Sequence, residues 1–292
     1  MGRRFLSEEL LAGPLARRRA GPWRYTNRKH ANHQPVCYRA MTREASLDPS
    51  RLDPPELLVV IPVYNEQSSI DEVVREWMEE LERCCRSFTI LAIDDGSKDG
   101  SLEALQRLQE QWGPRLQVIT RPNRGHGQTC VEGYRRADAM GARYVFQIDS
   151  DGQCDPRYFP SLWRLREQFS VVYGVRIKRD DGLARVFISR ILRLMLLVAF
   201  QVNCRDANTP YRLMKTDETM WAVNRIPPEF GLANIALAIL LAGDHKCSHG
   251  FVPIGFRQRT GGQSSVKPSM FGRKAIELYR DIRRMRSEPQ SR

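Results

Sequence analysis

Between residues 57 and 148 the sequence alternates short apolar runs with amphipathic stretches, and this alternation limits the possible folds more than any other feature. The apolar runs have the length of buried strands, while the stretches between them repeat apolar residues every three or four positions, as helices do. Strands and helices that alternate at this spacing form a parallel sheet with helices on both faces. The expected strands are 57–63, 88–93, 116–120 and 144–148.

The first expected helix has the clearest pattern. Ser69 begins it, and Glu72 three residues later predicts a capping box, in which each side chain satisfies a backbone N–H of the first turn. The apolar residues that follow share one helix face: Ile70, Val73, Val74, Trp77, Met78 and Leu81.

The second half of the sequence is less regular, although it contains further candidate elements. The predicted fold class is α/β, with a mostly parallel central sheet flanked by helices and with amphipathic helices towards the C-terminus. The candidates are strands at 171–175 and 251–256, and helices at 183–202, 228–242 and 269–286.

Residues 1–55 are rich in arginine, proline and small residues and show no sustained periodicity, so we interpret them as a basic, flexible extension. The formal net charge of +12 favours acidic partners: anionic lipid, phosphate-bearing substrates or nucleic acid. Stacking aromatic residues and a recognition-helix pattern are both missing, which disfavours nucleic acid.

The sequence also bears on the cellular location. We see no secretory signal, and the longest apolar stretch, 191–202, falls short of the roughly 20 residues that a membrane span requires. The seven cysteines are scattered and are expected to be reduced thiols. We therefore expect a cytoplasmic protein.

Acidic residues follow three of the expected strands. Asp149 and Asp151 come directly after the strand at 144–148, and two carboxylates so close together favour a bound divalent cation, to which Gln153 adds an amide oxygen. Such a cation holds a diphosphate leaving group. An Asp-x-Asp sequence alone is weak evidence, since a chain of this length contains about one by chance.

The other two acidic strand ends strengthen the argument. Asp94-Asp95-Gly96-Ser97 closes the second strand, and Pro62-Val63-Tyr64-Asn65-Glu66 closes the first. In open α/β sheets, ligands bind outside the carboxyl ends of the strands. The three segments therefore predict a shared site that offers carboxylates and a tyrosine ring to a nucleoside diphosphate.

At this point the motifs resemble a known family. IPVYNE, IDDGSKDGS, NRGHGQ and IDSDGQ resemble the inverting family 2 glycosyltransferases of GT-A fold. YGVRIKRDDG, FISRILRL, CRDANTPYRLMK and VPIGFRQRTGGQSS look like the subgroup that makes polyprenyl-phosphate sugars, of which dolichyl-phosphate mannosyltransferase is a member. The resemblance covers about residues 56–285 and implies a GT-A domain at 56–292, with a donor half at 56–155 and an acceptor half at 156–292.

The resemblance implies a reaction and its components. A sugar would pass from a GDP- or UDP-sugar to a polyprenyl phosphate, with Mg²⁺ or Mn²⁺ as cofactor. An acceptor phosphate is already ionised and needs no general base, whereas a soluble hydroxyl acceptor, the alternative that stays open, would need one. Asp206 is the one candidate base, and we interpret it as structural.

The resemblance also assigns residues, and each assignment is an expectation. Asp151, Arg176 and Arg259 are the catalytic candidates, and the two arginines would hold phosphates. Arg212 and Asp206 would support the floor of the site. Pro62, Tyr64, Glu66, Ile93 and Asp95 would hold the nucleoside, Asp149, Asp151 and Gln153 the metal, and the Ser150 backbone would lie against the donor.

Two positions depart from the family pattern: Asp180-Asp181-Gly182 replaces a Gly-Gly pair, and Ser265 stands where the family has a lysine. The helices at 183–202 and 269–286 are amphipathic and suit either a membrane interface or packing on the sheet. Basic clusters favour an anionic membrane surface. The resemblance thus predicts a peripheral enzyme at the cytoplasmic face of a membrane, with a membrane-embedded subunit as a candidate partner.

His126, in the glycine-rich turn, is interpreted as a variable loop residue.

Overall fold

The computed structural model describes residues 54–177, 209–228, 230, 233–244 and 246–258. All of them lie in the unit Arg51–Arg292. Residues 1–53 of the expected N-terminal extension and the helices expected at 183–202 and 269–286 fall outside the described residues, as do both departures from the family pattern. So do Arg259 and Asp206.

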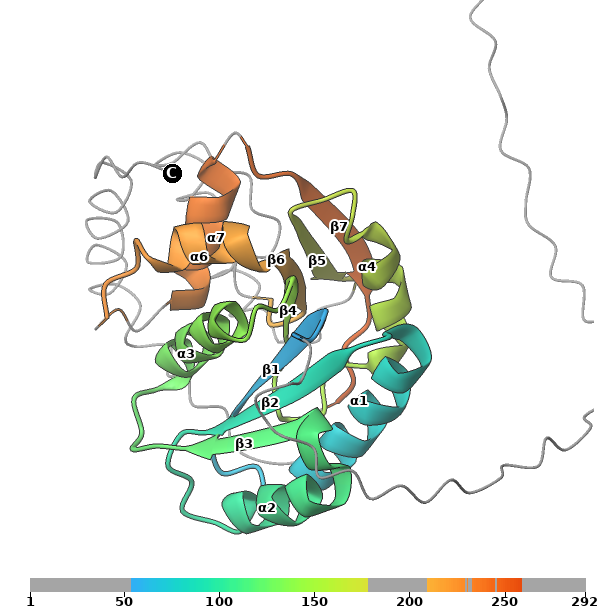
Figure 1. The fold of residues 1–292 in the computed structure, drawn as a ribbon, viewed down its shortest axis with the longest axis vertical. Helices are drawn as coiled ribbons and strands as arrows, with labels where there is room; N and C mark the ends of the chain where they lie inside the picture. Colours follow the sequence, from blue (N-terminus) through green and yellow to red (C-terminus); the bar gives the residue numbers. More distant parts are fainter. Residues whose placement is uncertain (1–53, 178–208, 229, 231–232, 245, 259–292) are drawn as a thin grey trace, which may run out of the picture. The chain divides into compact units, whose positions relative to one another are not determined.

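The described strands form one seven-stranded sheet in the order β3-β2-β1-β4-β6-β5-β7 (Figure 1). Strand bounds are β1 Leu57–Val63, β2 Phe88–Asp94, β3 Leu116–Thr120, β4 Tyr144–Gln147, β5 Val171–Arg176, β6 Arg212–Lys215 and β7 His249–Ile254. Helix bounds are α1 Ile70–Cys84, α2 Ser101–Trp112, α3 His126–Ala139, α4 Phe159–Leu165, α6 Thr216–Val223 and α7 Ala233–Gly243. Short 3₁₀ turns lie at Gly113–Arg115 and Pro156–Tyr158.

The sheet is mostly parallel, as predicted, with one antiparallel strand inside it. Strands β1 to β4 pair in parallel, with β1 between β2 and β4, and β5 pairs in parallel with β7. Strand β6 runs antiparallel to both of its neighbours, β4 and β5. We did not predict β6 from the sequence.

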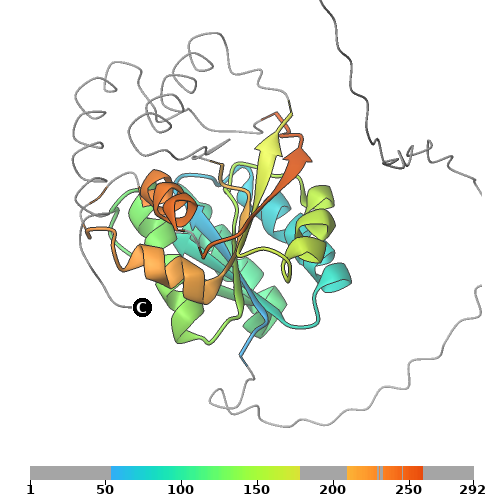
Figure 2. The ribbon, with the colours of Figure 1, turned by 90° about the horizontal axis from the view of Figure 1, so that it is seen from above.

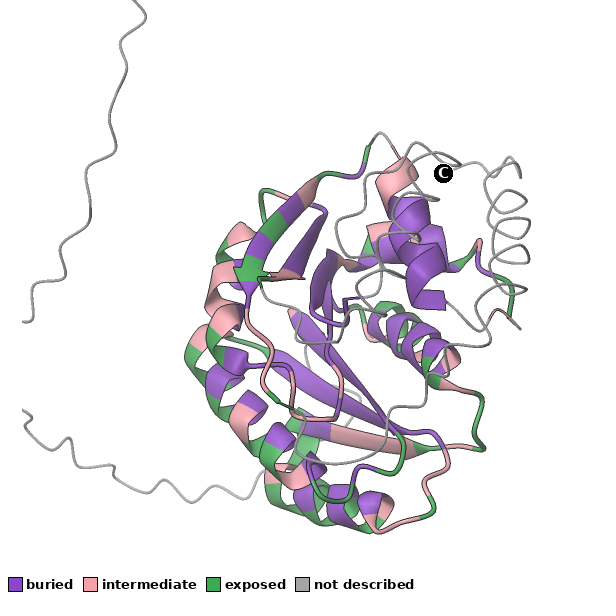
Figure 3. Ribbon diagram, turned by 180° about the vertical axis from the view of Figure 1, so that it is seen from behind, coloured by how far each residue is buried: buried purple, intermediate pink, exposed green. Residues whose placement is uncertain are grey.

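Two hydrophobic cores fill the two faces of the sheet. Helices α1, α2 and α4 cover one face and α3, α6 and α7 the other (Figures 1 and 2). Strand β1 alternates between them, since Val59 belongs to the first core and Val60 to the second. All six apolar residues predicted for the first helix are buried, and Figure 3 shows the buried sides of the helices turned towards the sheet. The chain therefore has the fold class predicted from its sequence.

One close approach fixes α3 against the central strand. Gly133 faces Val60, and a Cβ atom built on Gly133 would lie 2.2 Å from Val60 Cγ1. Any larger residue would force α3 or the Val60 side chain to shift, because two carbon atoms repel each other strongly at that distance. The spacing between helix and sheet is thus set by a missing side chain.

The capping box predicted at α1 is wrong. Ser69 is the N-cap residue, but its side chain makes no capping hydrogen bond. Its hydroxyl lies 2.9 Å from the carbonyl oxygen of Ser150, which it reaches across the sheet edge. A tertiary partner has therefore replaced the local one.

Two further predicted elements are present, although each begins at a different residue. The helix expected at 228–242 is α7, which begins five residues later, and the strand expected at 251–256 is β7, which begins two residues earlier. The described cysteines, namely Cys84, Cys85, Cys130, Cys154 and Cys247, are free thiols as expected. Within the described ranges, every helix is too short or too polar to cross a bilayer.

Candidate active site

The acidic segments follow three neighbouring strands. In the sheet β1 lies between β2 and β4, so that the segments after Val63, Asp94 and Gln147 leave the same edge side by side. Pro62, which lacks a backbone N–H, falls where β1 runs on beyond the last residue of β4. The parallel topology therefore produces the shared edge that the sequence predicted.

The segments after β1 and β2 are hydrogen-bonded to each other. Asn65 N donates to Ser97 Oγ at 3.0 Å, and Lys98 N donates to Asn65 Oδ1 at 2.7 Å. Asn65 has a positive φ of 55°, a conformation that asparagine tolerates better than most residues. This turn leaves Tyr64 exposed while Glu66 is buried. The tyrosine ring is thus available to a ligand at the edge.

Asp95 joins the end of β2 to the loop before α3. Its buried carboxylate accepts hydrogen bonds from Arg124 N at 2.9 Å and from Gly125 N at 2.8 Å. The Arg121 guanidinium lies 3.1 Å away and forms an ion pair with it. The φ of 87° at Gly125 places that residue in the left-handed region, which glycine adopts without strain. Asp95 therefore orders the glycine-rich loop.

The acidic loop, by which we mean residues 149–153 after β4, contacts both neighbouring segments. Ser69 Oγ donates to Ser150 O, and Ser69 Oγ also lies 3.2 Å from a carboxylate oxygen of Glu66. On the other side, Asp149 Oδ1 lies 3.0 Å from His126 Nε2. Asp151 accepts a hydrogen bond from the backbone N–H of Gln153.

These contacts close a ring that links the three strand ends. Hydrogen bonds join Glu66 to Ser69 and Ser69 to Ser150, and Asp149, the neighbour of Ser150, contacts His126. Gly125, the neighbour of His126, donates to Asp95, and the Asp95 N–H donates to Val63 O. Glu66, Asp95 and Asp149 are therefore brought together at one edge. Among the other predicted nucleoside residues, Ile93 is fully buried in the second core and Pro62 is also buried.

His126 is a member of this ring, although the sequence suggested only a variable loop residue. It is the first residue of α3, so its ring points from a helix start towards the acidic loop. The pKa of His126 is raised well above its ordinary value, chiefly by the nearby Cys130 sulfur and further by the hydrogen bond with Asp149. The available signal was a histidine inside a glycine turn that follows a strand.

Arg176 ends β5 and reaches the same region. Its guanidinium stacks over the Phe256 ring, 4.4 Å from the centroid. The buried Cys154 thiol connects it to the acidic loop electrostatically. Burial raises the pKa of Cys154 well above its ordinary value, the charges of Asp149 and Asp151 raise it further, and Arg176 lowers it. Phe256, which carries the Arg176 guanidinium on its ring, is bridged to Cys154 directly after the acidic loop.

Arg212 is the residue that the resemblance assigns to the floor of the site. It is fully buried in β6, opposite Gln147 of β4, and donates hydrogen bonds to the carbonyl oxygens of Thr209 and Asn234. Gln153 places its side-chain amide 3.4 Å from the Arg257 carbonyl oxygen.

The residues present suit a hard divalent cation only in part. Within the described residues, no cluster of three or more His, Cys, Asp or Glu side chains is arranged to hold a metal ion. Asp149 and Asp151 do supply two carboxylates on one turn, and the Asp149 side chain is one-third exposed. A cation bound there would take its other oxygen ligands from phosphate and water, which is how Mg²⁺ usually binds.

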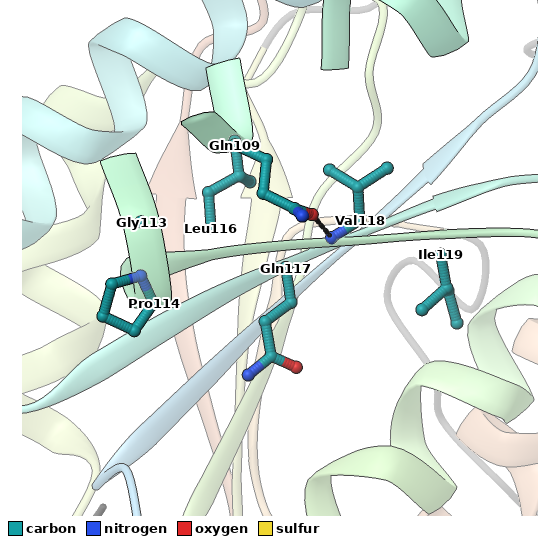
Figure 4. A pocket seen from close by; sticks show the side chains of 7 residues that line it. All are labelled: Gln109, Gly113, Pro114, Leu116, Gln117, Val118 and Ile119. Carbon is teal, nitrogen blue, oxygen red and sulfur yellow. Dashed lines mark hydrogen bonds between the residues drawn. The ribbon is translucent and has the colours of Figure 1, made fainter. Parts of the chain in front are cut away.

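A shallow hollow elsewhere on the molecule holds none of the predicted site residues. It lies along the edge strand β3 and the end of α2, where Gln109 Oε1 accepts a hydrogen bond from Val118 N (Figure 4). Its lining includes Pro114, Leu116 and Ile119. This hollow is separate from the acidic edge.

An α/β sheet with acidic residues outside its carboxyl edge is the arrangement in which nucleotide-binding proteins of this class hold their ligands. Residues 58–218 match the family model described as glycosyl transferase family 2. Because the match spans more than half of the 292 residues, the chain belongs to glycosyl transferase family 2. The resemblance recognised in its motifs is confirmed.

Several curated relatives carry the same name. The undecaprenyl-phosphate 4-deoxy-4-formamido-L-arabinose transferase of Pseudomonas syringae pv. syringae (strain B728a) is 35% identical over 150 residues, which are 51% of this chain and 44% of the relative. The enzyme of the same name from Salmonella choleraesuis (strain SC-B67) is 34% identical over 140 residues, or 47% and 42% of the two chains. The matched region therefore spans less than half the length of these relatives.

Solved structures show the same fold. Glucosyl-3-phosphoglycerate synthase from Mycobacterium tuberculosis in complex with phosphoglyceric acid has a TM-score of 0.56 at 17% identity, covering 85% of this chain and 88% of that chain. Its complex with Mn²⁺, UDP-glucose and phosphoglyceric acid has a TM-score of 0.55 at 16% identity, covering 85% and 87%. The predicted GT-A fold is therefore confirmed.

Proposed function

We propose that this chain is an inverting, metal-dependent glycosyltransferase that moves a sugar from a nucleoside diphosphate to a polyprenyl phosphate. The observation that carries the proposal is the hydrogen-bonded ring that gathers Glu66, Asp95 and Asp149 at one sheet edge. Family membership and the polyprenyl-phosphate transferases among the relatives support the same reaction.

In this proposal each part of the edge has a task. Tyr64 and Glu66 hold the nucleoside from one side and Asp95 supports the loop on the other, with buried Pro62 and Ile93 behind them. Asp149 and Asp151, with Gln153, are the protein's oxygen ligands, and the Ser150 backbone lies against the donor. When bound, Mg²⁺ or Mn²⁺ would neutralise charge on the diphosphate as it leaves.

Arg176 and Arg259 are the proposed phosphate-binding residues, because a planar guanidinium matches phosphate oxygens in pairs. Arg176 lies over Phe256, which is bridged to Cys154 directly after the acidic loop, whereas Arg259 lies outside the described residues. An acceptor phosphate oxygen attacks the anomeric carbon, the bond from that carbon to the diphosphate breaks, and the configuration inverts. The acceptor has no proton to lose, so the step requires no general base.

We further propose that the enzyme works at the cytoplasmic face of a membrane that bears anionic lipid. A polyprenyl phosphate is itself a membrane lipid, and the formal net charge of +12 favours an anionic surface. A membrane-embedded partner subunit would strengthen such docking.

The test is a transfer assay with radiolabelled UDP- and GDP-sugars, each with and without polyprenyl phosphate and with Mg²⁺ or Mn²⁺. We expect label in the organic phase only when lipid phosphate and metal are both present, and none with excess chelator. Transfer to water-soluble acceptors without lipid would favour the soluble-acceptor alternative instead. Full turnover in excess chelator would contradict the metal dependence.

A further inference from the structure

Two segments far apart in the sequence meet directly behind the acidic loop. The backbone N–H of Arg257 donates to the Gln153 carbonyl oxygen at 3.0 Å, and the Gln153 side-chain amide lies 3.4 Å from the Arg257 carbonyl oxygen. Cys154 and Phe256 form an isolated antiparallel bridge beside them. The chain that follows β7 therefore runs along the back of the acidic loop.

The Arg257 side chain ties this junction to α1. Its Nη1 atom donates to both carboxylate oxygens of Glu76, at 2.8 and 2.6 Å, and Nη2 donates to Asp155 Oδ1 at 3.1 Å. The hydrogen bonds to Glu76, and then the one to Asp155, hold the pKa of Arg257 above its ordinary value. Asp155 is buried, so its carboxylate is held in place by its surroundings.

Helix α1 is a fixed support for this arginine. Trp77, the neighbour of Glu76, is buried against Phe146 and Tyr211 in the first core, with ring centroids 5.3 and 5.8 Å away. Ser69 lies two helical turns before Glu76 and donates to Ser150 O. One helix therefore holds the acidic loop at two places about 10 Å apart along its axis.

The same junction carries Arg176. Its guanidinium lies over the ring of Phe256, the residue before Arg257, and a cation over an aromatic face is attracted to it. The segment that Arg257 fastens therefore supports both groups that face the diphosphate in the proposed function: the two carboxylates and one guanidinium.

We propose that Arg257 is a positioning residue that fastens the acidic loop, and through Phe256 also Arg176, to α1. This role deepens the proposed function and rests on it for its benefit to catalysis. The fastening itself is a property of the folded chain and does not depend on any ligand.

The first test follows amide hydrogen exchange of the full chain without ligand. Arg257→Met should raise exchange about tenfold in peptides that cover Gln153 and Arg257, the size expected when a charge-assisted contact is lost. Arg257→Lys keeps the charge but loses the paired geometry, so its exchange rate should fall between those of the wild type and Arg257→Met. Unchanged protection in both variants would overturn the proposal.

A matched control comes from the same helix. Arg115, just before the edge strand β3, forms an ion pair with Glu82 of α1 at similar exposure, six residues beyond Glu76. Arg115→Met should leave the protection of those peptides unchanged. Equal effects of Arg115→Met and Arg257→Met would also overturn the proposal, because they would show that any lost ion pair on α1 loosens the chain.

The second test measures binding of Mn²⁺ with UDP or GDP, from the free Mn²⁺ signal in electron paramagnetic resonance. Arg257→Met should weaken binding about tenfold, and Arg257→Met combined with Glu76→Gln should cost no more than either change alone. Wild-type affinity in Arg257→Met would contradict the positioning role. If the wild-type chain binds neither nucleotide, the proposed function fails, while the exchange experiment still decides whether Arg257 fastens the loop.

Discussion

Asp151 stands two residues after Asp149 on the same turn, and the two carboxylates are the strongest candidates to hold a cation. We expect Asp151→Ala to lower the transfer rate more than about 100-fold, beyond the usual cost of losing an outer-shell partner of a metal. The melting temperature should stay close to that of the wild type, because no core contact is removed.

The matched control is Asp138→Ala, which removes an exposed carboxylate on α3. It should leave the transfer rate unchanged. A large loss of rate in this control, or a retained rate in Asp151→Ala, would argue against a specific role for the acidic turn.

His249 at the start of β7 makes stability depend on pH. Burial lowers its pKa from the ordinary value of 6.5, and its ring stacks on Tyr173 with centroids 6.0 Å apart. The folded chain thus binds fewer protons than the unfolded chain, so this contribution is present above pH 6.5 and is lost as the pH falls below it. We expect His249→Phe, which keeps a stacking ring, to flatten the fall in unfolding free energy between pH 7 and pH 5. If the unfolding free energies of the wild type and His249→Phe fall equally with pH, His249 is not the group responsible.

At the scale of elements, the contact between α3 and β1 is the tightest constraint described. We expect Gly133→Ala to lower the free energy of unfolding by about 1–3 kcal/mol, as overpacked cores usually do. Chemical denaturation measures this loss. Gly133→Ala combined with Val60→Ala should lose less than the sum of the two single losses, since the second change makes room for the first. Strict additivity would mean that the two side chains do not compete for space.

The elements that the sequence predicted well are those with long apolar periodicity. Helix α1 and strands β1, β2 and β4 follow from pattern alone, because each contributes several buried apolar residues to the two cores. Strand β6 escaped prediction because it has only four residues, two of them basic, and because Arg212 is buried through hydrogen bonds to carbonyl groups. Such a strand is defined by its partners and has little signal of its own.

The site shows the same division. The acidic strand ends were predictable, since parallel topology sends them to one edge. The partners that join them were not: the Ser69 hydroxyl crosses to Ser150 in place of its own helix, and His126 reaches Asp149 from another element. Contacts over long sequence separations depend on the assembled fold.

At the scale of the whole molecule, the position of β6 has a consequence for how the protein can be divided. The boundary between residues 155 and 156 separates the expected donor and acceptor halves, yet residues 212–215 from the later half lie hydrogen-bonded along residues 144–147 of the earlier one. A fragment that stops at residue 155 exposes the flank of its last strand, and unpaired flanks promote aggregation. Produced alone, that fragment should precipitate or unfold without cooperativity, as light scattering and circular dichroism would show. Supplied together, the two pieces should complement each other, because residues 212–215 can then pair with residues 144–147 again.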